Sequence, residues 1–341
     1  MRALLTLAVG LVLCARVMAD IVPGTLDVKA AFEKSDLVCN CFVRSIAIME
    51  ERSIVNRPGV SIIRRRMRAN VEIKDLYKSR EPNGQSIVVE YVRDIPNMSA
   101  SQPGLSVGEK ALLFLKATGP ATYMFADPFL GATPFSSLPR QTGKLGLAKL
   151  ESALVGASLL GNQYNRSNAL RLLQGFESLD QASFARIVPL STSKDPEIAF
   201  SALAILLKTR TPESVERLKR YLDGYKGDEP IAVQSIGTEL GRIRDVRALP
   251  AIEVLSRAKF VPVRYGAMDA MRGMKSRQSA PTLVQRLDYP DSLVQYLAVI
   301  TLAEIFGKYE DYAPSMYLFD KNPRRYIDLW KKWWAEQGHN Y

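Results

Sequence analysis

Apolar and polar residues follow two different periods along this chain. In residues 20–138, short apolar runs are separated by Gly and Pro turns, and from Met67 to Lys74 apolar and polar residues alternate strictly. That alternation is the period of a strand with one buried face. In residues 150–321 the apolar residues recur three or four positions apart, as in amphipathic helices. We therefore expect a multidomain α+β protein: a β domain at 20–138, a linker at 139–149 and a helical domain at 150–321.

The helical part contains a loose internal repeat. Phe200, Val233, Tyr265 and Tyr296 recur at spacings of 33, 32 and 31 residues, and each is followed two positions later by Ala or Ser. A repeat of this length is typical of one helical hairpin, which cannot bury its apolar face alone and stacks on its neighbours. The sequence thus predicts an α-α superhelix, an architecture that usually presents a binding surface.

The turns inside the repeats are basic. Three first helices are predicted to open at Asp195-Pro196, Glu229-Pro230 and Val261-Pro262, and to end near Leu207, Gly241 and Gly273. The turns that follow them carry seven cations: Lys208, Arg210, Arg242, Arg244, Lys275, Arg277 and Lys308. Two interpretations stay open. Cations at the C-terminal ends of helices complement the helix dipole, whereas stacked turns would also form a basic ridge able to bind an acidic partner, polysaccharide or lipid headgroup.

The last segment, residues 322–341, is predicted to be a separate aromatic helix and tail. Tyr326, Trp330, Trp333 and Trp334 recur at helical spacing. Terminal repeats need an atypical element to cover the last exposed core face, so we expect a capping helix. The alternative is a helix at a membrane interface, because cations flank the aromatic residues.

The first 19 residues have the pattern of a signal peptide. Arg2 precedes an apolar run from Ala3 to Leu13, and small residues lead to Ala19. This order predicts export to the periplasm or beyond the cell, with cleavage after Ala19. A lipoprotein signal at Cys14 is disfavoured because Leu13 stands where a small residue is expected. No apolar run after residue 19 is long enough to span a membrane.

The charge is positive but spread along the chain. The formal net charge is +11, and removal of Arg2 and Arg16 with the signal peptide leaves +9. A diffuse excess of this kind supports weak attraction to anionic surfaces and does not indicate a nucleic-acid partner. A basic run at Ile63–Arg68 lies on a predicted strand without stacking aromatic residues, which favours a solvated outer face.

Two cysteines remain after cleavage, Cys39 and Cys41. Their spacing in the apolar run Leu37–Val43 predicts side chains on the same face of a strand. The first interpretation is a pair of small core residues, and the alternative is a disulfide in an oxidising compartment. A metal site is not expected, because no further Cys or His could complete one.

The sequence offers little for catalysis. Its one histidine, His339, is the third residue from the C-terminal end, and a single histidine so placed excludes the usual His-based triads and zinc motifs. No phosphate-binding loop or dinucleotide fingerprint is present. We expect a protein that is not an enzyme and uses no cofactor. An enzyme that hydrolyses its substrate through carboxylates is the least favoured of three functional hypotheses.

Two families resemble parts of the chain. The repeats of residues 150–310 are similar to HEAT repeats, especially the short bacterial kind first associated with phycobilin lyases. The order Phe32–Val38, Val71–Lys78, Ile87–Val89 and Gly108–Leu115 resembles the OB-like barrel of netrin-type and metalloproteinase-inhibitor domains. These resemblances imply an N-terminal OB-like β-barrel followed by a HEAT-like solenoid. The expected function is non-catalytic binding of a protein, or of a polymer, through the solenoid; the alternative is a protease-inhibitor-like module acting through the β domain.

Overall fold

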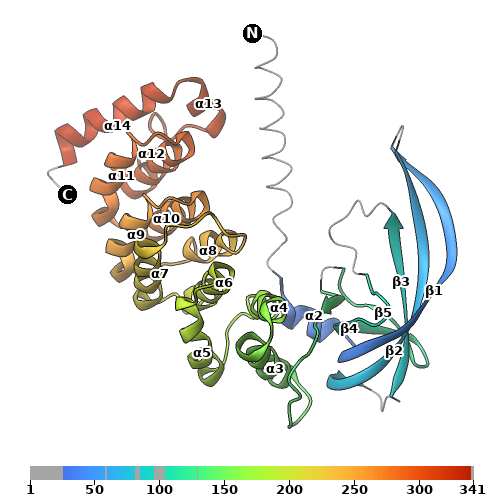
Figure 1. The fold of residues 1–341 in the computed structure, drawn as a ribbon. Helices are drawn as coiled ribbons and strands as arrows, with labels where there is room; N and C mark the ends of the chain where they lie inside the picture. The colour runs from blue at the N-terminus through green and yellow to red at the C-terminus, as the bar shows by residue number, and fades with distance from the viewer. Residues whose placement is uncertain (1–25, 58–59, 81–84, 96–103, 129, 339–341) are drawn as a thin grey trace. The chain divides into compact units, whose positions relative to one another are not determined.

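The computed structural model describes residues 26–57, 60–80, 85–95, 104–128 and 130–338 (Figure 1). Its contacts divide the chain into two compact units, Met1–Leu179 and Asp180–Tyr341. The predicted signal peptide, residues 1–19, lies outside the described residues, as does His339. An N-terminal sheet followed by helices makes the chain a mixed α+β protein, as the two periods predict.

The first unit contains a six-stranded sheet. The strands are β1 (Leu37–Arg57), β2 (Val60–Ser79), β3 (Ser86–Ile95), β4 (Lys110–Gly119), β5 (Thr122–Phe125) and β6 (Ala132–Pro134). Their order is β1-β2-β3-β5-β4-β6, and β1 also pairs with β4. The pairing of β3 with β5 is parallel and the others are antiparallel. The hydrogen-bonded pairs therefore run in a closed cycle, β1-β2-β3-β5-β4-β1.

The strands β1 and β2 extend beyond this cycle. The pairing of β1 with β4 covers only Leu37–Phe42, whereas its pairing with β2 continues to Arg57. The result is a long curved hairpin (Figure 1). The predicted alternation in β2 is confirmed: Met67, Ala69 and Val71 are buried, while the intervening polar residues are exposed.

Both faces of the β1–β4 region are buried. Cys39, Cys41 and Val43 lie in one core with residues of β2, β3 and β4. On the alternate positions of β1 and β4, Val38 and Phe114 are also fully buried, which explains the continuous apolar runs in these strands. Three helices belong to the same unit and pack on the sheet: α2 (Val28–Lys34) on β4, α3 (Leu147–Leu160) on β2 and α4 (Gln163–Leu173) on β6.

An ion pair fixes α3 to the sheet. The Lys149 ammonium lies 2.8 Å from the Asp75 carboxylate, with side chains only 9% and 11% exposed, and donates to the Leu76 carbonyl. The predicted linker, residues 139–149, thus lies within the first unit and leads into a helix that packs on the sheet, while the division by contacts falls at Leu179 and Asp180. The domain limits drawn from composition stay a prediction.

The second unit is entirely helical. Its elements are α5 (Gln181–Ile187), η1 (Val188–Thr192), α6 (Pro196–Leu207), α7 (Pro212–Gly224), α8 (Val233–Leu240), η2 (Val246–Ala248), α9 (Leu249–Leu255), α10 (Val261–Met274), η3 (Arg277–Ser279), α11 (Ala280–Arg286), α12 (Ser292–Phe306), α13 (Met316–Lys321) and α14 (Pro323–Gln337). The helix α6 packs on α8, α8 on α10 and α10 on α12, while α7 packs on α9. The unit is a stack of helical hairpins (Figure 1).

Two of the three predicted helix starts are confirmed and one is wrong. The helix α6 begins at Pro196, with the Asp195 carboxylate capping its first turn, and α10 begins at Val261. The helix α8 begins at Val233 rather than at Pro230. There the Glu197 carboxylate of α6 accepts hydrogen bonds from the N–H groups of Ile231 and Ala232. A side chain from the preceding repeat satisfies these donors, so the segment need not be helical.

Candidate binding surface in the helical unit

The seven predicted cations lie in the turns that follow α6, α8, α10 and α12, here called the basic turns. Consecutive turns are neighbours in the structure. The Lys208 ammonium lies 3.9 Å from the Glu239 carboxylate of the next hairpin. In the following pair, Gly273 lies so close to Arg244 that a Cβ atom there would come within 2.2 Å of the guanidinium carbon. The stack therefore brings the basic turns together along one edge.

Three of the seven cations are used inside the fold. Lys208 and Arg242 both pair with Glu239, which is only 6% exposed. The Lys308 ammonium lies over the rings of Tyr312 and Trp333, 5.3 and 5.4 Å from their centroids. These cations are partly buried. The Lys208 contact joins two successive hairpins, the Arg242 contact lies within one hairpin, and Lys308 contacts the aromatic residues of the C-terminal cap.

The other four cations, Arg210, Arg244, Lys275 and Arg277, are exposed. Arg244 also donates hydrogen bonds to the carbonyls of Gly241 and Ile243 just beyond α8, at 2.6 and 2.8 Å. This contact satisfies backbone acceptors at the helix end. Arg210 and Lys275 adopt the left-handed conformation, with φ of 54° and 50°, and Lys275 is the C-cap of α10. An exposed cation is thus present at each of three successive turns.

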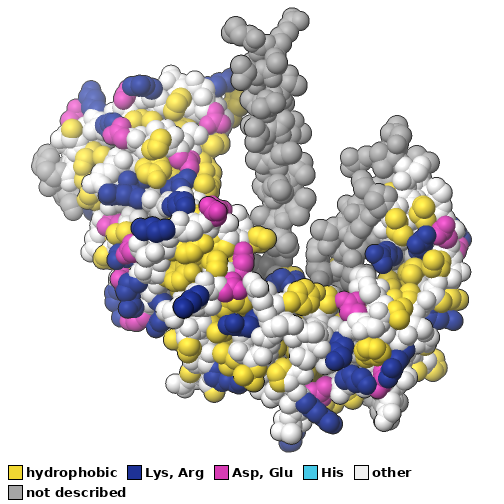
Figure 2. All heavy atoms as spheres, viewed as in Figure 1, with side chains coloured by type: hydrophobic (Ala, Val, Ile, Leu, Met, Phe, Trp, Pro, Cys, Tyr) yellow, Lys and Arg dark blue, Asp and Glu magenta, His cyan; other side chains and the backbone are white. Residues whose placement is uncertain are grey.

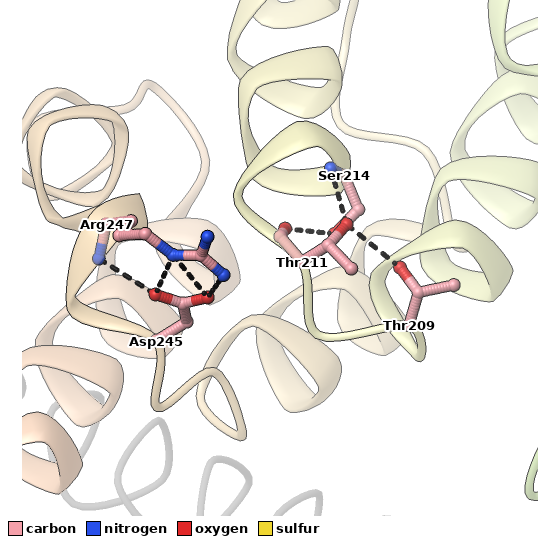
Figure 3. Close-up of polar contacts among 5 residues, drawn as sticks. All are labelled: Thr209, Thr211, Ser214, Asp245 and Arg247. Carbon is pink, nitrogen blue, oxygen red and sulfur yellow. Dashed lines mark hydrogen bonds and ion pairs between the residues drawn. The ribbon is translucent and has the colours of Figure 1, made fainter.

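A neighbouring charge pair was not singled out from the sequence. The Asp245 carboxylate accepts from the backbone N–H and the guanidinium of Arg247, at 3.0 and 2.7 Å (Figure 3). The Arg247 side chain, and then its N–H group, hold the pKa of Asp245 below its usual value. In the turn before α7, the Thr211 hydroxyl accepts from the Ser214 N–H. Both contacts fix turns at the same edge, and the sequence signal for each is an N-cap residue.

The basic run of the first unit is largely neutralised. Arg64 pairs with Asp94 through two hydrogen bonds of 2.8 and 3.0 Å, and Glu90 lies between Arg66 and Arg68. The hydrogen bonds from these two arginines hold the pKa of Glu90 below its usual range. Figure 2 likewise shows Lys and Arg side chains spread over the visible face of each unit among Asp and Glu.

Cys39 and Cys41 are free thiols in the core of the sheet, each 0% exposed. The structure therefore has two core residues on one face of β1, not a disulfide. Burial raises the pKa of the Cys41 thiol to about 12 and that of Cys39 well above its usual value. In the described parts of the chain, no group of three or more His, Cys, Asp or Glu residues could hold a metal ion.

The aromatic helix α14 buries its apolar face. Tyr326, Trp330 and Trp333 are buried in the core of the helical unit, and α14 packs against α11, α12 and α13. The Trp330 indole N–H donates to the Tyr312 carbonyl at 3.2 Å. The face that could have entered a membrane interface is thus covered by the fold. No helix in the described residues is long and apolar enough to cross a membrane.

Comparisons with known proteins show no family for the chain. No family model matches it, and no curated protein matches it. A solved structure of the complex of CpcE and CpcF of phycocyanin lyase from Nostoc sp. PCC7120 is 13% identical, with 51% of this chain and 70% of that chain covered and a TM-score of 0.38. An engineered protein is 16% identical over 54% of this chain and 96% of its own, with a TM-score of 0.34. Similarity at this level assigns neither a family nor a function to the chain.

Proposed function

We propose that the chain is an exported, non-catalytic binding protein whose helical unit binds an acidic protein partner along the basic turns. The observation that carries this proposal is the exposed cation at each of three successive turns: Arg210, Arg244 and the pair Lys275 and Arg277. Packed helices lie roughly 8–10 Å apart, so these charges form a regularly spaced row. Such a row attracts a partner that carries carboxylates along one side.

The partly buried cations support this arrangement. Lys208, Arg242 and Lys308 hold the turns in place through Glu239 and the aromatic cap. A rigid row loses little conformational entropy when it binds, and this preorganisation favours affinity. Within this proposal the second unit is a HEAT-like solenoid, and what supports that assignment is the 31- to 33-residue repeat together with the stacking of α6, α8, α10 and α12.

For the first unit we propose an OB-like barrel. Its support is the closed cycle of strand pairings with one parallel pair, β3 with β5, since closure removes the exposed sheet edges that antiparallel folds must protect. The hypothesis of a protease inhibitor has no specific observation in its favour, because the two cysteines are buried within β1. Export itself rests on the pattern of residues 1–19.

The proposal is tested by charge reversal. The variant Arg210→Glu/Lys275→Glu/Arg277→Glu leaves the buried contacts of the basic turns intact. A matched control, Arg186→Glu/Lys226→Glu/Arg324→Glu, changes the same number of exposed cations outside these turns. Each protein, without residues 1–19, is immobilised and exposed to an envelope extract, and bound proteins are quantified at increasing salt.

We expect the natural protein and the control to retain a common acidic partner, which elutes at moderate salt, and the reversed variant to lose it. Retention of that partner by the reversed variant would overturn the role of the basic turns. Binding only to an anionic polysaccharide matrix, with no protein retained, would replace the protein partner by a polymer.

A further inference from the structure

A pocket of about 400 Å³ lies between η1 and α7, and none of the seven cations of the basic turns lines it. Its lining includes Thr192, Arg217, Arg220, Tyr221, Gly224 and Tyr225. Pockets of roughly 300–1,000 Å³ are the size that holds small organic ligands. Nothing in the proposed protein-binding role uses this site.

The wall formed by α7 follows from helix geometry. The residues that α7 and its C-cap contribute stand at positions i, i+3, i+4, i+7 and i+8, beginning at Arg217. That spacing places them on one stripe of the helix. At Gly224 a Cβ atom would meet nothing within 4 Å, so the end of this stripe is open to solvent.

The apolar part of the pocket is a fixed aromatic pair. The rings of Tyr221 and Tyr225 are stacked, with centroids 5.7 Å apart and planes at 18°. Behind them the buried Phe200 ring meets both edge-on, at 5.3 Å in each case. This packing holds the two tyrosines in place, which preorganises a surface for a flat ring.

The phenol groups remain available as polar contacts. Burial raises the pKa of Tyr221, and the nearby Tyr225 and Asp195 add to the rise, so its hydroxyl is neutral at pH 7. Tyr225 donates to the Asp228 carbonyl at 2.9 Å. In the described residues no hydrogen bond engages the Tyr221 hydroxyl, which leaves a donor at the pocket.

Two arginines, Arg217 and Arg220, line the pocket. Among the described residues neither Arg217 nor Arg220 forms an ion pair, whereas Lys219 on the same helix pairs with both Glu216 and Asp223. The two acidic side chains of α7 that are nearest in sequence to Arg217 and Arg220 therefore pair with Lys219. Two guanidinium groups beside an aromatic pair match a ligand with one anionic group and one flat apolar group.

We propose that this pocket binds a small aromatic carboxylate. The carboxylate accepts hydrogen bonds from the guanidinium groups of Arg217 and Arg220, and the ring of the ligand packs on Tyr221 and Tyr225. The same chemistry is offered by a free acid and by the C-terminal residue of a peptide that ends in an aromatic side chain. The experiment distinguishes these two sources.

In the test, the protein that lacks residues 1–19 is titrated with naphthalene carboxylate in a calorimeter. Naphthalene carboxamide serves as the neutral ligand of the same shape. We expect saturable binding of the acid, weaker binding of the amide, and a loss of about tenfold in affinity for each of Arg217→Gln and Arg220→Gln. As a control, the variant Arg186→Gln changes an exposed arginine on α5, and it should bind the acid as the natural protein does.

Equal affinity of acid and amide would overturn the proposal, as would unchanged affinity in the Arg217→Gln/Arg220→Gln variant or the absence of saturable binding to the natural protein. Thermal unfolding of each variant shows that it is folded, and Arg217→Lys, which keeps the charge but loses the planar fork, should bind with intermediate affinity. A peptide that ends in Trp with a free carboxylate, with its amidated form as the control, identifies the source of the ligand. Tighter binding of this peptide than of naphthalene carboxylate assigns the site to chain ends, and weaker binding of the peptide assigns it to small acids.

Discussion

Gly237 and Gly266 lie against each other where α8 packs on α10, and neither position has room for a side chain. A Cβ atom on Gly266 would lie 2.3 Å from the carbonyl oxygen of Gly237, and one on Gly237 would lie 2.4 Å from that of Pro262. The obstructing atoms belong to the backbone, so no rotamer change can relieve the contact. The close approach of these helices sets the spacing of two successive repeats.

We expect Gly266→Ala to destabilise the helical unit by about 2 kcal/mol, because inserting a methyl group into a packed contact costs roughly 1–3 kcal/mol. The preference of Ala for helices offsets part of this cost. Chemical denaturation measures the change in the free energy of unfolding. The control Gly224→Ala, with open space around its Cβ, should be neutral or slightly stabilising, and equal effects in the two variants would contradict the close contact.

The ion pair of Lys149 and Asp75 yields a second prediction. In Lys149→Met the Asp75 carboxylate, which is mostly buried, loses its cation. The expected loss is about 3 kcal/mol in the free energy of unfolding, as for other broken buried pairs. The exposed residue Lys29 on α2 provides the control Lys29→Met, which should stay within about 0.5 kcal/mol of the natural protein.

A double-mutant cycle separates this pair from general effects of the substitution. Combining Lys149→Met with Asp75→Asn should cost less than the sum of the two single changes, because the second change removes the uncompensated charge. Strict additivity would mean that the two side chains do not interact.

The pH dependence of the Asp245 and Arg247 pair has a defined sign. The pKa of Asp245 lies below its ordinary value of 3.8 in the folded protein. The stabilisation from this pair is therefore fully present above pH 3.8 and is lost as the pH falls through the lower, folded-state pKa. Carbon NMR titration should show the pKa of Asp245 rising in Arg247→Gln and unchanged in Arg242→Gln. An unchanged pKa in the first variant would exclude the pair.

The state of Cys39 and Cys41 gives a chemical prediction. Both thiols are wholly buried with raised pKa values, so a thiol reagent should not modify them in the folded protein at pH 8. It should modify two thiols per chain in denaturant, because the thiolate is the reactive form and unfolding exposes it. Ser53→Cys, at an exposed position of β1, is the reactive control. A mature chain two hydrogens lighter by mass spectrometry, unreactive even in denaturant, would show a disulfide instead.

Local sequence signals predicted much of the helical unit. The starts of α6 and α10 follow from Pro near the N-terminus of each helix, and in α6 also from the Asp195 cap. The start of α8 could not be read in the same way. Its N-terminal segment is held by Glu197, 34 residues earlier than Ile231, and a contact across repeats depends on how the hairpins stack.

For the basic turns, too, the sequence predicted some features and the tertiary structure decided others. The sequence located all seven cations of the basic turns, but it left open whether each one caps a helix, pairs inside the fold or faces solvent. The stacking decided this, since Glu239 of one hairpin lies within reach of Lys208 from the one before. The pocket beside Tyr221 was not found, because its walls come from η1 and α7 and its second layer from Phe200.

By itself the sequence determined the α+β class, the period of the repeat and the position of its turns, because caps, alternation and helical spacing act over a few neighbouring residues. Tertiary structure alone decided the closed cycle of strand pairings, the attachment of α3 through Lys149, the contact of Gly237 with Gly266 and the exposure of each cation. The contacts of Lys149 with Asp75, of Gly237 with Gly266 and of Lys208 with Glu239 join residues about 30 or more positions apart. Their energies exist only once the chain has placed both partners, so no local pattern records them.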